Sequence, residues 1–147
     1  MEKTTAIIAR HEGLRLKPYR CGANKLSIGY GRNLDDVGIS KAEADAMLAA
    51  DVTIAYTEAS GFDWFTGLNG PRRAAIVDMI FNLGLPRFRG FKNTLMYLDQ
   101  ADYIGASAEI LAGTGHGGRS RWYVQVGQRA EEISEMLKTG KWPDELS

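Results

Sequence analysis

The sequence predicts an α+β fold in which one long helix joins a small β-sheet lobe to a larger all-helical lobe. Alternating apolar residues and glycine-rich turns are confined to residues 14–34, whereas helical spacing of apolar residues fills 41–59 and most of 60–147. The 44% hydrophobic and 24% charged residues are close to the averages for globular domains, so the chain can bury a core. We expect a single domain over residues 1–147, with a sheet lobe at 12–40, a connecting helix at 41–59, and a helical lobe at 60–147 that includes an N-terminal helix at 3–11.

The charge and cysteine content limit the possible partners. Eighteen basic and eighteen acidic residues cancel, so the net charge suggests neither nucleic acid nor a membrane surface as a partner. Cys21 is the single cysteine, which excludes an intrachain disulfide and suits a reducing cytoplasm. The apolar run at 6–9 is too short for a signal peptide or a membrane span. Two histidines are too few for a zinc site, and we expect no metal, no cofactor, no stable membrane insertion and a monomer.

The first forty residues predict a helix followed by a β-hairpin or a small three-stranded sheet. The helix over 3–11 has Ile7 and Ile8 on one face and ends at Gly13. A turn at 22–25 and the glycine-spaced segment 27–31 then favour strands. Strand alternation predicts two sets of side chains on opposite faces. The set expected to face the core is Leu14, Leu16, Leu26 and Ile28, and the set expected to face away is Cys21, Ser27, Gly29 and Gly31.

The remainder of the chain predicts helices. Ser40 and Glu43 form a capping-box signature, which starts a helix at Lys41. Apolar residues three and four apart then define one face of that helix: Ala44, Met47, Leu48, Val52, Ala55 and Tyr56. Further helices are expected at 72–83, begun by Pro71 and ended by Gly84, and at 92–98, 103–112 and 121–138, with a flexible loop at 113–118. A cleft between two such lobes is the default place for a substrate.

Glu12 is the candidate for acid chemistry because it falls where the first helix gives way to the hairpin. Hydrolysis of a glycosidic bond needs a protonated carboxylic acid and a second group that activates water or stabilises the transition state. A glutamate near apolar side chains can retain its proton near neutral pH. On the residues alone, a solvated surface glutamate is the more frequent interpretation.

The segments 11–19 and 26–31 resemble the N-terminal motif of phage-type lysozymes, the T-even and lambdoid endolysins of glycoside hydrolase family 24. That motif is a glutamate, eight residues, an aspartate or sometimes a cysteine, five residues, and a threonine. Glu12, Cys21 and Ser27 have this spacing. Segments 72–75, 81–84, 90–95 and 120–123 also resemble the family, so the resemblance spans most of the chain.

The resemblance implies a lysozyme-like fold and a set of site residues. Glu12, Cys21 and Ser27 would be catalytic, while substrate binding would fall to Tyr30, Phe81, Asn82, Thr94 and Arg121. Cys21 stands where aspartate is commonest, and its role as base, nucleophile or packing residue stays open. A free thiol has a pKa of about 8.5. We therefore expect the neutral thiol to dominate near pH 7 unless a cation such as Arg20 or Lys25 lowers that pKa.

The resemblance also implies a substrate and a place of action. The chain would be a muramidase that hydrolyses the β-1,4 bond between N-acetylmuramic acid and N-acetylglucosamine in the glycan strands of peptidoglycan, for host-cell lysis. The alternatives are a lytic transglycosylase acting on the same bond, or a wall-binding or phage structural module without turnover. We expect synthesis in the host bacterial cytoplasm without a signal peptide and action on the cell wall in the periplasm after release through a holin. Inversion or retention at the anomeric carbon stays open, because it depends on the separation of the catalytic groups.

Overall fold

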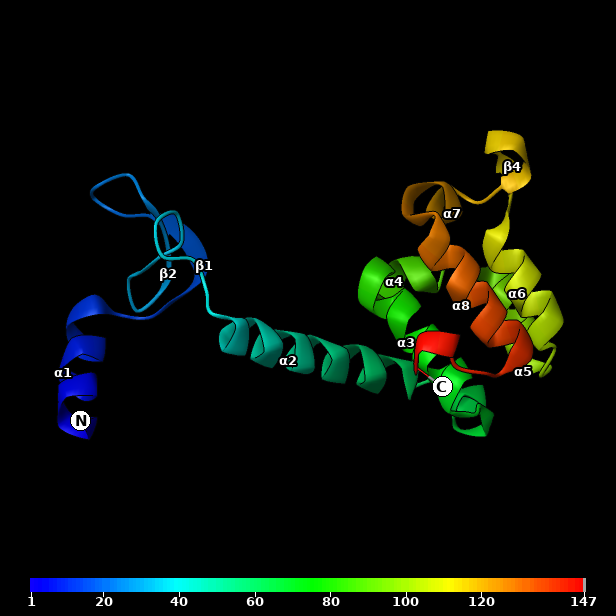
Figure 1. Ribbon diagram of the computed structural model, residues 1–147, viewed down its shortest axis with the longest axis horizontal. Coiled ribbons are helices and arrows are strands. Elements are labelled where there is room, and N and C mark those ends of the chain that lie inside the picture. The colour runs from blue at the N-terminus through cyan, green and yellow to red at the C-terminus, as the bar shows by residue number, and fades with distance from the viewer. Residues whose placement is uncertain (147) are drawn as a thin grey trace. The chain divides into compact units, whose positions relative to one another are not determined.

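A computed structural model describes residues 1–146 and divides the chain into two compact units (Figure 1). The first unit is Met1–Leu48 and the second begins at Ala49. Helix α2, Lys41–Ala59, carries the chain from the first unit into the second. A small antiparallel sheet in the first unit and a mainly helical second unit confirm the predicted α+β class.

The first unit consists of one helix, a three-stranded sheet and the start of α2. Helix α1 is Glu2–Glu12 and ends at Gly13, whose φ of 70° favours glycine. Strands β1, Arg15–Arg20, β2, Leu26–Gly29, and β3, Arg32–Asn33, pair antiparallel in the order β1-β2-β3. The predicted N-terminal helix and small sheet are thus confirmed, with the helix one residue longer at each end.

The predicted division of the sheet residues into a core-facing and an outward-facing set was wrong. Leu14 and Leu16 are 54% and 79% exposed, whereas Ser27 is only 2% exposed. The pairing of β1 with β2 shifts register between Arg15 and Tyr19. An irregularity of this kind changes which side chains face which side, so strict alternation does not hold across it.

Helix α2 begins with the predicted capping box. The backbone N–H of Ser40 donates to Glu43 Oε2 at 2.8 Å, and the N–H of Glu43 donates to Ser40 Oγ at 3.2 Å. Arg32 adds an ion pair with Glu43 at 2.8 Å, which ties β3 to the start of the helix. The predicted apolar face is buried only near the end of the helix, at Ala55, because Val52 and the apolar residues before it are exposed.

The second unit is built from short helices. They are the 3₁₀ helix η1, Asp63–Gly67, followed by α3, Gly70–Leu83, α4, Leu85–Phe88, α5, Lys92–Asp99, α6, Tyr103–Leu111, the strand β4, Ala112–Gly115, η2, His116–Gly118, α7, Arg121–Val126, α8, Gln128–Thr139, and η3, Asp144–Leu146. The helices predicted at 72–83, 92–98 and 103–112 are confirmed within a few residues. The short helices η1, α4 and η3 were not predicted.

Two predictions in the last third of the chain were wrong. The helix expected over 121–138 is broken into α7 and α8 at Gly127, whose φ of 54° and ψ of −120° do not belong to a helix. The stretch expected to be a loop at 113–118 instead contains β4 and η2, and Arg119 forms bridges with Ala112 and Gly115. Glycine permits such backbone angles without a steric penalty, so the break needs no proline.

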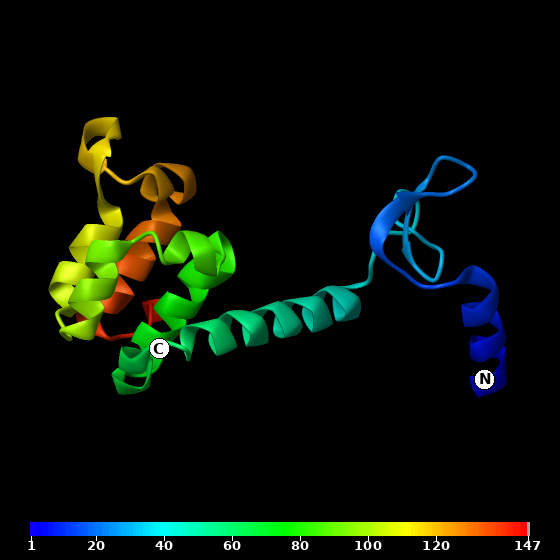
Figure 2. The same cartoon turned by 180° about the vertical axis from the view of Figure 1, so that it is seen from behind.

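The hydrophobic core lies in the second unit. Both views show α6 beside α8, and α3 also packs on α8 (Figures 1 and 2). The largest fully buried side chains are Phe65, Phe88, Ile76, Met79, Ile80, Leu98, Ile110, Leu137 and Thr94. In the first unit, by contrast, Ser27 is the one buried residue of 1–48. The second unit therefore supplies a rigid frame for any site built on its helix ends.

Candidate active site

Glu12 is the last residue of α1, and its side chain is exposed. Its carboxylate lies directly against Gly31 in the turn between β2 and β3. A Cβ added at Gly31 would lie 2.7 Å from Glu12 Oε2, and the φ of Gly31 is +74°. Within residues 1–146, Glu12 has no hydrogen-bonding or ionic partner. Both carboxylate oxygens are therefore free to meet a ligand, and the missing side chain at Gly31 leaves them the room.

Cys21 follows β1 and opens the turn to β2. Its N–H donates to the carbonyl of Lys25 at 2.9 Å, and its own carbonyl accepts from the N–H of Asn24 at 2.8 Å. Hydrogen bonds from the backbone amides of Lys25 and then Ala23 lower the pKa of the Cys21 thiol below its usual value, and the hydroxyl of Ser27 adds to this effect. The turn therefore favours the thiolate form of Cys21.

Ser27 lies beside Cys21 in β2, opposite Tyr19 of β1. It is buried, and its hydroxyl also approaches the carbonyl of Lys25 at 3.3 Å. The structure thus brings together two of the three predicted catalytic residues, the thiol of Cys21 and the hydroxyl of Ser27. Glu12 contacts the same sheet at Gly31 and touches neither of the other two.

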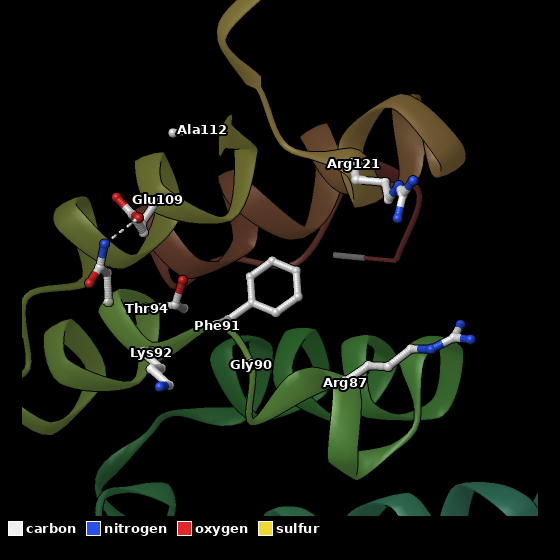
Figure 3. Close-up of a pocket in the computed structure, with 9 residues that line it drawn as sticks. Arg87, Gly90, Phe91, Lys92, Thr94, Glu109, Ala112 and Arg121 are labelled. Carbon is white, nitrogen blue, oxygen red and sulfur yellow. Dashed lines mark hydrogen bonds between the residues drawn. The ribbon is translucent and has the colours of Figure 1, made fainter. Parts of the chain in front are cut away.

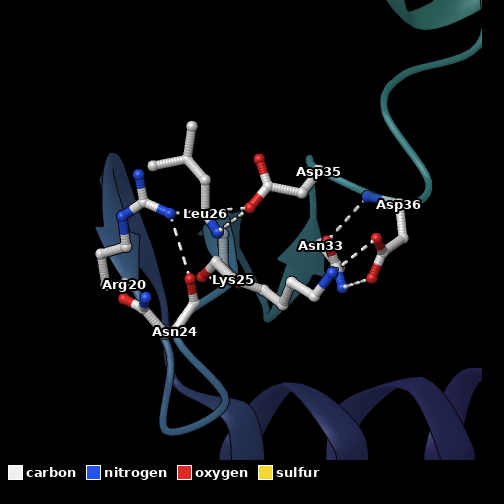
Figure 4. A network of polar contacts seen from close by, with 8 residues as sticks. Arg20, Asn24, Lys25, Leu26, Asn33, Asp35 and Asp36 are labelled. Carbon is white, nitrogen blue, oxygen red and sulfur yellow. Dashed lines mark hydrogen bonds and ion pairs between the residues drawn. The ribbon is translucent and has the colours of Figure 1, made fainter.

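The expectation that Arg20 or Lys25 would lower the pKa of the thiol was wrong. Arg20 lies 3.7 Å from Asp35, and Lys25 forms an ion pair with Asp36 at 2.8 Å (Figure 4). Asp35 also accepts a hydrogen bond from the N–H of Leu26 at 2.8 Å. These carboxylates neutralise both cations and hold the β1–β2 turn in shape, so the turn acts on Cys21 through its backbone amides and not through its charges.

The lowered pKa predicts how the thiol will react with an alkylating reagent. Because the thiolate is the reactive form, alkylation of native Cys21 by iodoacetamide should reach its half-maximal rate at a lower pH than in the urea-unfolded chain. The pH profile of carbamidomethylation, followed by mass spectrometry, measures this shift. Ser27→Ala should move the native midpoint part of the way back up. Identical midpoints for the native and unfolded chains would contradict this account of the turn.

Tyr30 follows β2, and its ring is 52% exposed. It lines a shallow hollow on α1 together with Thr5, Ala6, Ile8 and Ala9. This predicted substrate-binding residue therefore lies on the first unit, against the middle of α1, one residue before the glycine that contacts Glu12.

Thr94 and Arg121, two further predicted substrate-binding residues, line one hollow of about 720 Å³ in the second unit (Figure 3). The start of α5, the end of α6 and the start of α7 form its walls, and the ring of Phe91 lies on its floor. Thr94 is fully buried, and its Oγ1 has no hydrogen-bond partner. A volume of this size is within the range of small-molecule sites.

Phe81 and Asn82 are not part of that hollow. Phe81 is 41% exposed and lines a separate depression with Ile54, Asp51 and Glu58 of α2. The Oδ1 atom of Asn82 accepts a hydrogen bond from Trp122 Nε1 at 2.8 Å. Its carbonyl oxygen therefore holds α7 against α3, and only its amide group remains to meet a ligand.

Three residues of the hollow escaped sequence reasoning: Arg87, Lys92 and Glu109. Arg87 and Lys92 flank the Gly90–Phe91 pair within seven residues of Thr94, so their closeness in sequence was an available signal. Glu109 is brought in by the packing of α5 on α6, where its Oε1 accepts from Asn93 Nδ2 at 2.8 Å. In residues 1–146 no group of three or more His, Cys, Asp or Glu side chains could hold a metal ion.

A helix that ends in an unpartnered glutamate beside a small sheet, followed by a helical unit, defines a lysozyme-like α+β protein. Residues 9–132 match the family model described as phage lysozyme, and the chain belongs to that family. It is 36% identical over 114 residues to an endolysin of Acyrthosiphon pisum secondary endosymbiont phage 1, across 75% of this chain and 76% of the relative. The matched region contains Glu12, Cys21 and Ser27 as well as the hollow of the second unit.

The helices are also informative about membranes. Across residues 1–146, none of them combines the length and the apolar content that crossing a bilayer requires.

Proposed function

We propose that this protein lyses bacterial cell walls as a muramidase, which hydrolyses the β-1,4 bond between N-acetylmuramic acid and N-acetylglucosamine in peptidoglycan. The observation that supports this most directly is the free carboxylate of Glu12, seated against Gly31 at the end of α1. Membership of the phage lysozyme family and the likeness to a phage endolysin support lysis of peptidoglycan in general.

In this proposal Glu12 is the general acid. It donates its proton to the oxygen of the leaving sugar while a water molecule attacks the anomeric carbon. Cys21 and Ser27 act on that water. The Cys21 thiolate accepts its proton, and the buried hydroxyl of Ser27 holds the thiol in place. The lowered pKa of Cys21 supports a role in chemistry over a role in packing alone.

The proposed substrate contacts follow from side chains that are free to make them. The partly exposed rings of Tyr30 and Phe81 suit the apolar faces of sugar rings. Thr94 and Arg121 line the large hollow, and the amide group of Asn82 remains free as a donor. These residues are proposed to bind the glycan strand.

The identity of the products tests the reaction. Purified peptidoglycan is digested with the protein, and the fragments are weighed by mass spectrometry. Hydrolysis leaves reducing N-acetylmuramic acid ends, whereas a transglycosylase leaves anhydro ends that are lighter by one water. Sedimentation with peptidoglycan but no new ends of either kind would instead identify a wall-binding module and overturn the proposal.

Replacing Cys21 tests its role in the reaction. Cys21→Asp should retain activity and shift the acidic limb of the pH–rate profile to lower pH, because a carboxylate loses its proton at about pH 3.9. Cys21→Ala should lower the rate by about 10²-fold, which is the lower range for a lost base. The rate of release of reducing ends, measured from pH 4 to 9, reports both effects. If Cys21→Ala is as active as the parent, Cys21 is a packing residue.

The proposal extends to the route by which the protein reaches its substrate, because the curated relative is a phage endolysin. We propose synthesis in the host cytoplasm and release to the periplasm through a holin. Expression in a Gram-negative host with and without a phage holin tests this. Lysis should require the holin, and prompt lysis without it would contradict this route.

A further inference from the structure

The hollow of the second unit is lined by positive charges that no other residue neutralises. Arg87, Lys92 and Arg121 all line it, and none of the three has a hydrogen bond or an ion pair within residues 1–146. Figure 3 shows the three side chains around the ring of Phe91. Other basic residues of the second unit are paired, as Arg129 is with Asp78 at 2.8 Å.

The one acidic group of the hollow does not balance these cations. Glu109 accepts a hydrogen bond from Asn93 at 2.8 Å, which directs one of its oxygens to an amide (Figure 3). Three positive side chains therefore stand against a single carboxylate that is already engaged. In a chain with equal numbers of acidic and basic residues, this is a local excess that favours an anion.

A second, independent observation points to a ligand in the same place. Thr94 is fully buried, and its Oγ1 is one of two buried side-chain polar atoms in residues 1–146 that have no hydrogen-bond partner. Buried hydroxyl groups are nearly always hydrogen-bonded, because an unmet group loses its contact with water without replacement. A ligand atom in the hollow would supply the missing partner of Thr94.

We propose that this hollow binds a free carboxylate of the peptide stem that peptidoglycan carries on N-acetylmuramic acid. This inference rests on the proposed function, and it names a second part of the same substrate. N-acetylglucosamine is uncharged, and the lactyl group of N-acetylmuramic acid is amide-bonded to the stem, so the sugars offer these cations no charge. The stem carries free carboxylates, which arginine binds through two parallel N–H groups.

The size of the hollow fits this assignment. About 720 Å³ is enough for several amino-acid residues, whereas a single ion would leave most of it empty. Phe91 adds an apolar surface for the stem's side chains, and its ring packs edge-on against Trp122 at 6.2 Å between centroids. The floor is therefore rigid, and the charges stand at the rim.

The first test compares three substrates that differ only in the stem. They are peptidoglycan strands with intact stems, the same strands stripped of stems by an amidase, and strands whose stem carboxylates have been converted to methylamides. The wild-type KM should be about tenfold lower on intact strands than on either of the others, since charge-assisted contacts are the strong ones. Equal KM values on all three substrates would overturn the proposal.

The second test removes the charges one at a time. Arg87→Gln and Lys92→Gln should each raise KM on intact strands several-fold and leave KM on stripped strands unchanged. Lys141→Gln is the matched control, because Lys141 is an exposed lysine of the same unit outside the hollow. An equal rise in KM on intact and stripped strands would show that the cations bind sugar and not the stem.

Thr94→Val separates a ligand contact from a purely structural role. Removing an unsatisfied buried hydroxyl should raise the Tm, while KM on intact strands rises because the stem loses a hydrogen bond. A variant with a raised Tm and an unchanged KM on every substrate would show that Thr94 does not contact the stem.

Direct binding keeps this inference independent of catalysis. The probe is the dipeptide L-alanyl-γ-D-glutamate, titrated into the full chain with Lys92→Gln in parallel and inorganic phosphate as a competing anion. Dipeptide binding that weakens in Lys92→Gln supports the proposal even if the chain cleaves no glycan. Binding of phosphate but not of the dipeptide would assign the hollow to phosphate-bearing polymers, and binding of neither would overturn the proposal. Failure of the proposed function would appear instead as absent cleavage of all three strands.

Discussion

Replacing Glu12 with glutamine is expected to lower the rate of glycan cleavage by about 10³-fold, within the range measured for loss of a general acid. The amide has the shape of the carboxylic acid but no acidic proton for the leaving oxygen. Because Glu12 is exposed and has no partner in residues 1–146, the change breaks no contact that stabilises the fold. Release of reducing ends from purified peptidoglycan and clearing of permeabilised Gram-negative cells measure the effect.

The matched control is Glu2→Gln at the other end of α1. Glu2 is also exposed, and the substitution makes the same change of charge in the same helix. Its activity should equal that of the parent. Circular dichroism and thermal unfolding should be unchanged in both variants. A well-folded Glu12→Gln protein that retains full lytic activity would sink the assignment of Glu12 as the acid.

Gly31→Ala should have the second-largest effect, a loss of activity on the order of 10²-fold, because a small misplacement of a catalytic group can cost that much. The new methyl group would lie 2.7 Å from Glu12 Oε2, which is closer than real contacts allow. The flexible carboxylate must therefore move, and the rate should fall through kcat. Steady-state kinetics on purified glycan strands measure the change.

Gly29→Ala is the control for backbone strain. Gly29 has a φ of +68°, close to the +74° of Gly31, but a Cβ there would meet nothing within 4 Å. Both variants should lose stability by about 1–2 kcal/mol, the usual cost of a left-handed conformation in a residue with a side chain. Only Gly31→Ala should lose activity beyond that. Equal losses of activity in the two variants would trace the effect to strain and not to the position of Glu12.

Local signals explain which helices the sequence could predict. The capping box of Ser40 and Glu43 placed the start of α2 at the correct residue, because its reciprocal hydrogen bonds involve only neighbouring positions. Gly84 ended α3 for a similar reason, as its φ of 76° suits glycine. Gly127 gave the same kind of signal within 121–138, but an isolated glycine inside a helical pattern is often tolerated, so the break between α7 and α8 was missed.

The site was less predictable because its geometry depends on contacts between segments. Spacing alone placed Cys21 and Ser27 in one motif, and the structure brings them together. Alternation nevertheless put Ser27 on the wrong face, since the register shift in β1 leaves no mark in composition. The hydrogen bonds that lower the pKa of Cys21 come from the amides of a turn, which no side-chain pattern reveals.

The charged hollow shows the same limit. Thr94 and Arg121 were predicted by resemblance, yet their meeting with Glu109 depends on the packing of α5 and α7 around the end of α6. The two arginines of the hollow are 34 residues apart in the chain, by subtraction of their numbers, 121 − 87. Local patterns do not report contacts over such a separation.

The scarcity of buried side chains in the first unit bears on how the protein can be divided and reused. Ser27 is the one buried residue of 1–48, so this segment has no apolar interior of its own. Chains this short rarely bury enough surface to fold alone without a disulfide or a metal, and Cys21 has no second cysteine to pair with. The segment that bears Glu12 is therefore not a portable module: it cannot be excised or grafted onto another scaffold, and chimaeric lysins should exchange the chain whole.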